Sequence, residues 1–146
     1  MGFHTLRAER DPDQLEALTR LNVDDLITSF KLDRIRRGRR LLELLCWPPS
    51  RRFAHQILAY EQMVGSTGMH VGASWIVHTF ARRLEISNAE RVPAHGPLLV
   101  LSNHPGMSDA MALFTALRRA DLKVIAAERK LLRLLPNISR CLVFIP

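Results

Sequence analysis

Apolar and polar residues follow helical spacing through the first half of the chain. Leucines three residues apart come after the Asp-Pro dipeptide at 11–12, which is typical of a helix start with aspartate as the N-cap and proline in the first turn. A short apolar helix over residues 41–45 is expected to end at Pro48-Pro49, because proline disrupts a helix interior. Helical spacing then returns over residues 51–84.

The spacing changes after residue 83, where runs typical of strands begin. Residues 84–88 alternate between apolar and polar, and residues 98–102 form a continuous apolar run that is expected to be buried on both faces of a sheet. Strands and helices then alternate, which predicts a mostly parallel sheet with crossover helices. The expected elements are strands at 84–88, 98–102, 122–126 and 142–145, a helix at about 108–119 capped by Ser108 or Asp109, and a helix at 129–135.

The fold class that follows is α/β. A helical, membrane-proximal region is expected over residues 1–83, and the first part of an α/β domain over residues 84–146. The chain stops within the strand-like run that ends at Pro146, and a core strand is a poor place for a domain to end. We therefore expect the sheet to be truncated at the C-terminus and the chain to be a fragment.

Composition and charge restrict the partners of this chain. It is 47% hydrophobic and 24% charged, as in a globular protein, and its formal net charge is +7. A positive net charge favours an anionic partner, such as lipid head groups, phosphorylated substrates or nucleic acid. Aromatic residues make up only 6% and are not interleaved with the basic ones, so we expect no nucleic-acid partner.

The cysteines and histidines indicate neither a disulfide framework nor a metal site. Cys46 and Cys141 lie in apolar surroundings and resemble small buried hydrophobic residues, which suits a reducing compartment. No zinc-type spacing occurs, and His70 and His78 have no nearby carboxylate. The N-terminus lacks the apolar segment of a signal peptide. We therefore expect a cytoplasmic protein without a bound metal.

Residues 62–81 contain no Asp, Glu, Lys or Arg, and this uncharged segment is long enough for a membrane span of about 20 residues. Histidines, hydroxyl residues and glycines interrupt the run. An interfacial or tightly packed helix is therefore favoured over a span, and the Gly68-x3-Gly72 spacing would permit close helix approach.

A polar motif follows the apolar run at 98–102. It begins at Asn103 and places His104 five residues before Asp109, with Pro105 and Gly106 favouring a turn between them. A neutral imidazole suits general-base catalysis near neutral pH, and a carboxylate on its other ring nitrogen would hold one tautomer. The alternatives are a helix N-cap for the aspartate and a loop histidine bonded to backbone.

The segment Gly96-Pro97-Leu98-Leu99-Val100-Leu101-Ser102-Asn103-His104, with the His-x4-Asp spacing, resembles block I of the glycerolipid acyltransferases. This family includes the lysophosphatidate and glycerol-3-phosphate acyltransferases. Residues 122–128 and 134–136 are similar to the second strand and helix of the family. The resemblance covers residues 84–146, which would then be a partial acyltransferase domain.

The resemblance implies an O-acyltransferase of phospholipid biosynthesis. It would move a fatty acyl group from acyl-CoA or acyl carrier protein to the hydroxyl of a lysophospholipid, 1-acyl-glycerol-3-phosphate. His104 would be the general base and Asp109 its orienting partner, with no protein nucleophile and no bound cofactor. Asn103, Gly106 and Met107 would lie at the mouth of the acceptor pocket.

The family's second block has an arginine just after a Phe-Ile-x step, and its third block is a Pro-Glu-Gly segment. Residues 144–146 resemble the Phe-Ile-x step, and the chain ends before the arginine and the third block. Two alternatives to the enzyme therefore stay open: a catalytically incomplete fragment, and a basic module that binds membrane or nucleic acid.

Arginines cluster at 34–40 beside the apolar residues 41–47. Such a run is either a solvated face or a surface for anionic lipid. The second case predicts a peripheral protein on the inner face of the membrane. The pair Arg118-Arg119 either binds a phosphorylated acyl carrier or solvates a helix.

Overall fold

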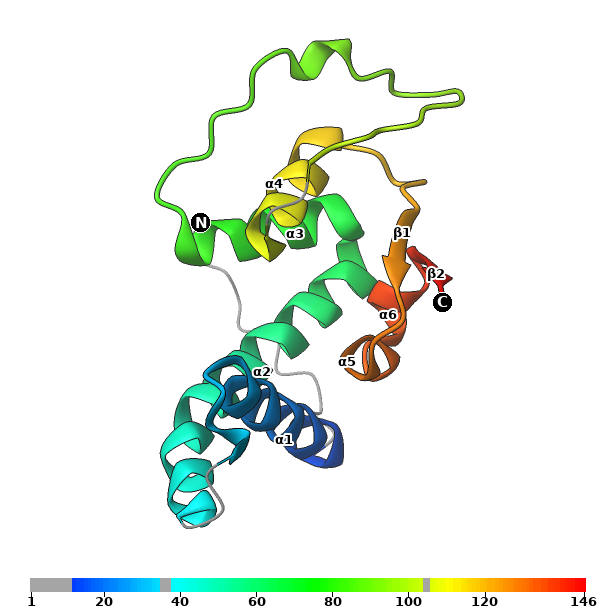
Figure 1. The fold of residues 1–146 in the computed structure, drawn as a ribbon. Helices are drawn as coiled ribbons and strands as arrows, with labels where there is room; N and C mark the ends of the chain where they lie inside the picture. Colours follow the sequence, from blue (N-terminus) through cyan, green and yellow to red (C-terminus); the bar gives the residue numbers. More distant parts are fainter. Residues whose placement is uncertain (1–11, 35–37, 104–105) are drawn as a thin grey trace. The chain divides into compact units, whose positions relative to one another are not determined.

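A computed structural model describes residues 12–34, 38–103 and 106–146 (Figure 1). Most of the described residues are helical. The chain's contacts divide it into two compact units, Met1–Leu58 and Ala59–Pro146, which are called here the first and second units. The elements are α1 (Pro12–Ser29), α2 (Arg39–Thr67), α3 (Met69–Phe80), α4 (Met107–Leu117), β1 (Val124–Ala127), α5 (Lys130–Arg133), α6 (Pro136–Ser139) and β2 (Leu142–Ile145), with 3-10 turns at Leu32–Arg34 and Ala89–Arg91.

The first unit consists of α1 and the first two-thirds of α2, which confirms the expected helical N-terminal region. The side-chain amide of Asn22 donates a 3.4 Å hydrogen bond to the carbonyl of Ser50, and Arg39 lies 3.1 Å from Asp24, so the two helices are joined by polar contacts. The apolar side chains buried in this unit are Leu15, Leu18, Val23, Ile27, Ala54 and Leu58. Their spacing is that of one apolar stripe on each helix.

Helix α2 continues through Pro48 and Pro49, so the expectation that it would end there is wrong. The prolines remove the backbone bonds to the carbonyls of Leu44 and Leu45, and these two residues are exposed, which lets water satisfy the carbonyls. Ser50, which directly follows the two prolines, is buried, and this burial helps to keep the chain helical there.

Two glycines shape the turn from α2 to α3. Gly68 has φ +89°, a left-handed conformation that suits glycine and ends α2. A Cβ added at Gly72 would lie 2.8 Å from Cγ2 of Val64 and 3.1 Å from Cε2 of Tyr60, so α3 approaches the end of α2 closely. The Tyr60 hydroxyl also lies 2.9 Å from the sulfur of Met69. The expected close helix approach is confirmed at Gly72, whereas Gly68 serves the turn.

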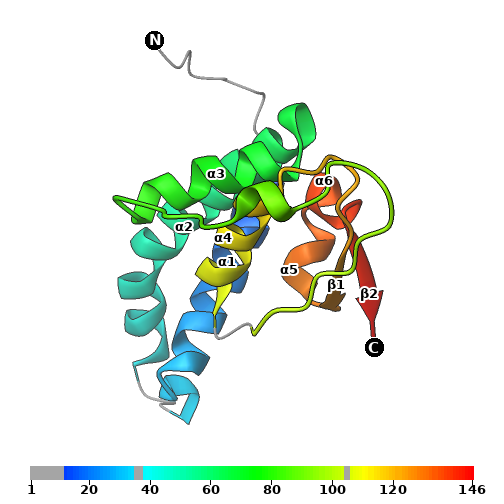
Figure 2. The ribbon, with the colours of Figure 1, turned by 90° about the horizontal axis from the view of Figure 1, so that it is seen from above.

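Strands β1 and β2 pair in parallel, with Val124 opposite Leu142 and Ala127 opposite Ile145. Figure 2 shows the two strands side by side, with α5 and α6 in the chain between them. The buried carboxylate of Glu61, on α2, accepts hydrogen bonds from the N–H groups of Asn137 (2.6 Å) and Ile138 (2.9 Å). These N–H groups belong to the first turn of α6 and have no partner inside the helix, so Glu61 caps α6.

The larger parallel sheet is not formed by the described residues, whose sheet has two strands. The expected strands at 84–88 and 98–102 are both wrong, because the chain there is irregular and extended without a paired neighbour. The connection that contains them arcs away from α3 and α4 (Figure 1). The predicted division between residues 83 and 84 falls inside the second unit.

Residues Leu98 to Leu101 are exposed rather than buried on both faces. The exposed fractions are 41% for Leu98, 78% for Leu99, 37% for Val100 and 86% for Leu101. They alternate with the period of two that an extended backbone imposes. The segment therefore has the conformation of a strand without the partner that would bury it.

None of the described helices combines the length and the apolar character needed to cross a membrane.

Candidate functional site

The predicted site lies where the connection from α3 enters α4. His104 and Pro105 fall outside the described residues, so the pairing of His104 with Asp109 stays a prediction. Asn103, directly before them in the chain, is exposed. The described part of the predicted site is therefore Asn103 on one side and the first turn of α4 on the other.

Gly106 and Asp109 are brought together at the start of α4. Gly106 is extended and is the N-cap, so the expected cap at Ser108 or Asp109 is wrong. Asp109 is the third residue of the helix, and its N–H donates to the Gly106 carbonyl at 3.2 Å. The helix therefore begins two or three residues earlier than a cap at Ser108 or Asp109 would place it.

The carboxylate of Asp109 lies over the backbone of Gly106. A Cβ added at Gly106 would stand 3.4 Å from Oδ2 of Asp109, so the carboxylate points back toward the incoming loop. It is exposed, and an acidic group in the first turn interacts favourably with the helix dipole. Met107 is the first residue of α4.

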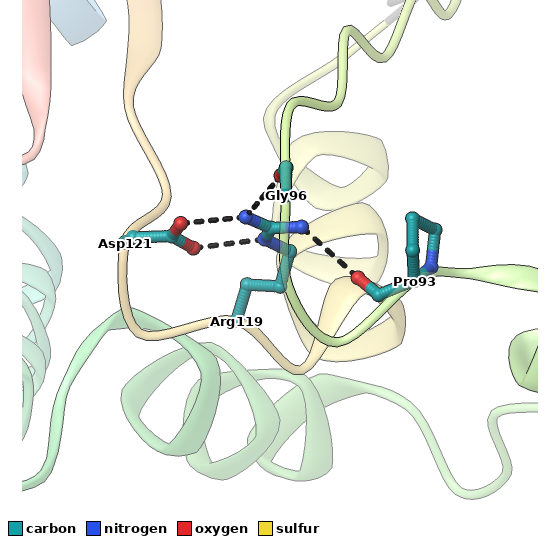
Figure 3. Close-up of polar contacts among 4 residues, drawn as sticks. All are labelled: Pro93, Gly96, Arg119 and Asp121. Carbon is teal, nitrogen blue, oxygen red and sulfur yellow. Dashed lines mark hydrogen bonds and ion pairs between the residues drawn. The ribbon is translucent and has the colours of Figure 1, made fainter.

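Arg119 holds the middle of the same connection (Figure 3). Its guanidinium donates to the carbonyls of Pro93 (3.0 Å) and Gly96 (2.9 Å) and makes a two-point contact with the carboxylate of Asp121, with Nε to Oδ1 at 2.8 Å and Nη2 to Oδ2 at 2.5 Å. The side chain is only 8% exposed. We call these four residues the Arg119 clip.

The hydrogen bond from Arg119 lowers the pKa of Asp121 below its ordinary value, and the nearby charge of Arg119 adds to the effect. The sequence pattern predicts that Arg119 binds a phosphorylated acyl carrier or solvates a helix. In the structure its guanidinium instead bonds to Asp121 and to two backbone carbonyls of the same chain. An arginine two residues before an aspartate is a weak signal, and the carbonyl partners 23 and 26 residues away carry no side-chain signature.

The first unit has a mixed basic and apolar surface on α2. Leu41, Leu44 and Leu45 are each more than half exposed and share one face of the helix, since they are three and four residues apart. An open pocket of about 740 Å³ beside them includes Arg40 and Trp47 in its lining. Arg39, also in this lining, is paired with Asp24 and Glu43.

Within the described ranges, no three side chains of histidine, cysteine, aspartate or glutamate gather as metal ligands would. The ring of His78 is within 2.6 Å of the Ser74 carbonyl of its own helix. Cys46 and Cys141 are free and half-buried.

Comparisons with protein-family models, curated proteins and solved structures found no match for this chain.

Proposed function

We propose that this protein is an acyltransferase. It would transfer a fatty acyl group from acyl-CoA or acyl carrier protein to the free hydroxyl of a lysophospholipid, 1-acyl-glycerol-3-phosphate. His104 would remove the proton from that hydroxyl, and Asp109 would orient the imidazole and stabilise the imidazolium that forms. The hydroxyl attacks the thioester carbonyl directly, the acyl–sulfur bond breaks, and the thiol leaves with a proton.

The observation that carries the proposal is the position of Asp109, the aspartate of the His-x4-Asp motif, in the first turn of α4. The Asp109 carboxylate is exposed, lies over Gly106 and points back toward the loop that carries His104 in the sequence. An aspartate that served only as an N-cap would stand at the position that Gly106 occupies. The exposed position leaves the carboxylate open to a partner and to an incoming substrate.

The test measures transfer of a labelled acyl group to 1-acyl-glycerol-3-phosphate by the protein and by its variants. His104→Ala is expected to lower turnover by about 10²- to 10⁴-fold, the usual range for a general base. Asp109→Asn keeps the size of the side chain and is expected to lower turnover on the same scale.

The matched control is His78→Ala, which removes an exposed histidine of α3. Its turnover should equal that of the unchanged protein. Full turnover by His104→Ala would overturn the assignment, whereas a loss in all three variants would point to a general effect on the fold.

A second function is supported by the first unit: docking on an anionic membrane from the inner, cytoplasmic side. The exposed leucines 41, 44 and 45 lie on the same stretch of α2 as Arg39 and Arg40, which is the combination that binds lipid interfaces. Basic residues near such a surface each contribute about 1 kcal/mol of attraction to anionic lipid. Membrane docking would bring the enzyme to its lysophospholipid.

Vesicle co-sedimentation tests the docking. Binding is expected with vesicles that contain anionic phosphatidylglycerol and not with neutral vesicles, and it should weaken with salt. The double variant Leu44→Ser, Leu45→Ser should lose binding, whereas Leu99→Ser, an exposed leucine of the second unit, should keep it. Steeply salt-dependent binding to duplex DNA with no binding to vesicles would support a nucleic-acid module instead.

A further inference from the structure

The connection between α3 and α4 depends on very few contacts. All residues described from 93 to 103 are exposed, so no core burial holds this stretch. Among these described residues, the hydrogen bonds to the chain are the two that the carbonyls of Pro93 and Gly96 accept from Arg119. The stretch is therefore tethered at its beginning, seven residues before Asn103.

The tether originates at the end of the helix that carries Asp109. Helix α4 ends at Leu117, and Arg118 has φ +47°, the left-handed conformation that terminates helices. Arg119 follows at once. Since α4 packs on α3 and buries Phe114 and Leu117, its two ends are fixed relative to each other.

Arginine is suited to this tether in a way that lysine is not. The planar guanidinium places donors toward three groups at once: the carboxylate of Asp121 and the carbonyls of Pro93 and Gly96 (Figure 3). Lysine has one nitrogen on a flexible stem and cannot reproduce the fork. Asp121 compensates the charge and fixes the plane of the guanidinium.

We propose that Arg119 is a positioning residue for the acyl transfer: it ties the turn at Pro93–Gly96, from which the loop to Asn103 and His104 departs, to the helix that carries Asp109. Arg119 does not touch substrate. It acts by fixing the start of this loop, whose other end is joined to α4 at Gly106. The inference rests on the proposed function for its kinetic part only.

The experiment compares Arg119→Lys with Arg118→Lys, the same change at the exposed neighbour. Asp121→Asn is a milder member of the series, because it leaves the carbonyl contacts in place. The first measurement is the NMR order parameter of the backbone amides of Ala94, His95 and Gly96. It should be close to about 0.85 in the unchanged chain and in Arg118→Lys, and fall below about 0.6 in Arg119→Lys.

The second measurement separates positioning from folding. Arg119→Lys is expected to lower kcat about tenfold with KM for the lysophospholipid within about twofold, because a loosened loop aligns the base less often while the acceptor still binds. The melting temperature, measured beside it, should change by less than a few degrees, because Arg119 holds an exposed connection and not an element of the core. Asp121→Asn should fall between Arg119→Lys and the unchanged protein.

Each outcome supports or overturns one part of the proposal for Arg119. Unchanged order parameters in Arg119→Lys would overturn the tether. Lower order parameters with unchanged kcat would overturn positioning and leave a structural contact. If the unchanged protein shows no turnover that His104→Ala removes, the proposed function fails and the kinetic part of this inference fails with it, whereas the order parameters still decide the tether.

Discussion

Two apolar runs of four residues have opposite outcomes in this molecule. Leu142–Ile145 forms strand β2, paired in parallel with β1. Leu98 to Leu101 is extended and alternates in exposure, yet has no paired neighbour among the described residues. Composition does not separate them, because both are built from leucine, valine and similar side chains that suit strands.

The difference lies in what holds each run in place. β2 directly follows α6, whose first turn is capped by the buried carboxylate of Glu61. This brings β2 to β1 in one register. The run at 98–101 has only the Arg119 clip at its start. A strand therefore forms where neighbouring elements deliver a partner, and the apolar pattern alone is not sufficient.

The largest expected effect comes from removing the anchor of the paired run. Glu61→Ala leaves two N–H groups of α6 without an acceptor in a buried place, which should cost about 3 kcal/mol of unfolding free energy. The melting temperature should fall by roughly 10 °C. Amide exchange at residues 124–127 should accelerate in parallel, measured by mass spectrometry, because the β1–β2 pair loses its support.

Glu43→Ala is the matched control, since this carboxylate is exposed and paired only with Arg39. It should change stability by less than about 0.5 kcal/mol. Equal losses for Glu43→Ala and Glu61→Ala would contradict the role of Glu61 as the anchor.

A pair of proline substitutions sharpens the comparison directly. Val143→Pro places proline in the middle of β2, opposite Ile125, where it interrupts the ladder and should cost at least about 1 kcal/mol in a denaturant titration. Val100→Pro places the same residue in the unpaired run and should change the unfolding free energy by less than about 0.5 kcal/mol. A larger loss at Val100 would mean that residues 98–101 are paired in solution.

The smallest effect concerns the clip that holds the unpaired run. Its carboxylate, Asp121, has a pKa lowered from the ordinary 3.8 by Arg119. A carboxylate whose pKa is lower in the folded state than in the unfolded state stabilises the folded state at pH values above its ordinary pKa. This stabilisation is lost as pH falls through the lowered pKa. The NMR signal of the Arg119 Nε–H should therefore shift in acid, below the ordinary range of aspartate, and Asp121→Asn should lack the transition.

The lowering of the Asp121 pKa should also become smaller with added salt, because Asp121 is largely exposed and its charge is screened. A signal that does not respond to pH in the unchanged chain would contradict the contact.

The sequence pattern correctly predicts the helices of the first half, the strand at 142–145 and, within two residues, the strand at 124–127. It is wrong about Pro48-Pro49, where α2 continues although the prolines remove two of its backbone hydrogen bonds. It is also wrong about the strands at 84–88 and 98–102, since periodicity describes one segment and pairing requires two. The helix predicted at 129–135 is shorter in the structure, where it is α5 (Lys130–Arg133), and α6 (Pro136–Ser139) was not predicted.

For the candidate site, the motif and its spacing are visible in the sequence. Asp109 lies in the first turn of a helix, close to where the sequence predicts that this helix begins. The role of Gly106 as N-cap could not be foreseen, because a glycine cap has no side-chain signal. The Arg119 clip could not be foreseen either, because two of its three partners are backbone carbonyls far away in the chain.

The sequence by itself determined the helical character of the first half, the strand at 142–145 and which residue types stand around the His-x4-Asp motif, because these depend on local propensity and spacing. Only the tertiary structure decided which apolar run pairs, that Glu61 caps α6, and that Arg119 tethers the loop before Asn103. The physical reason is the same in each case: pairing, capping and tethering join groups that are distant in the chain, and backbone donors and acceptors are identical at nearly every residue.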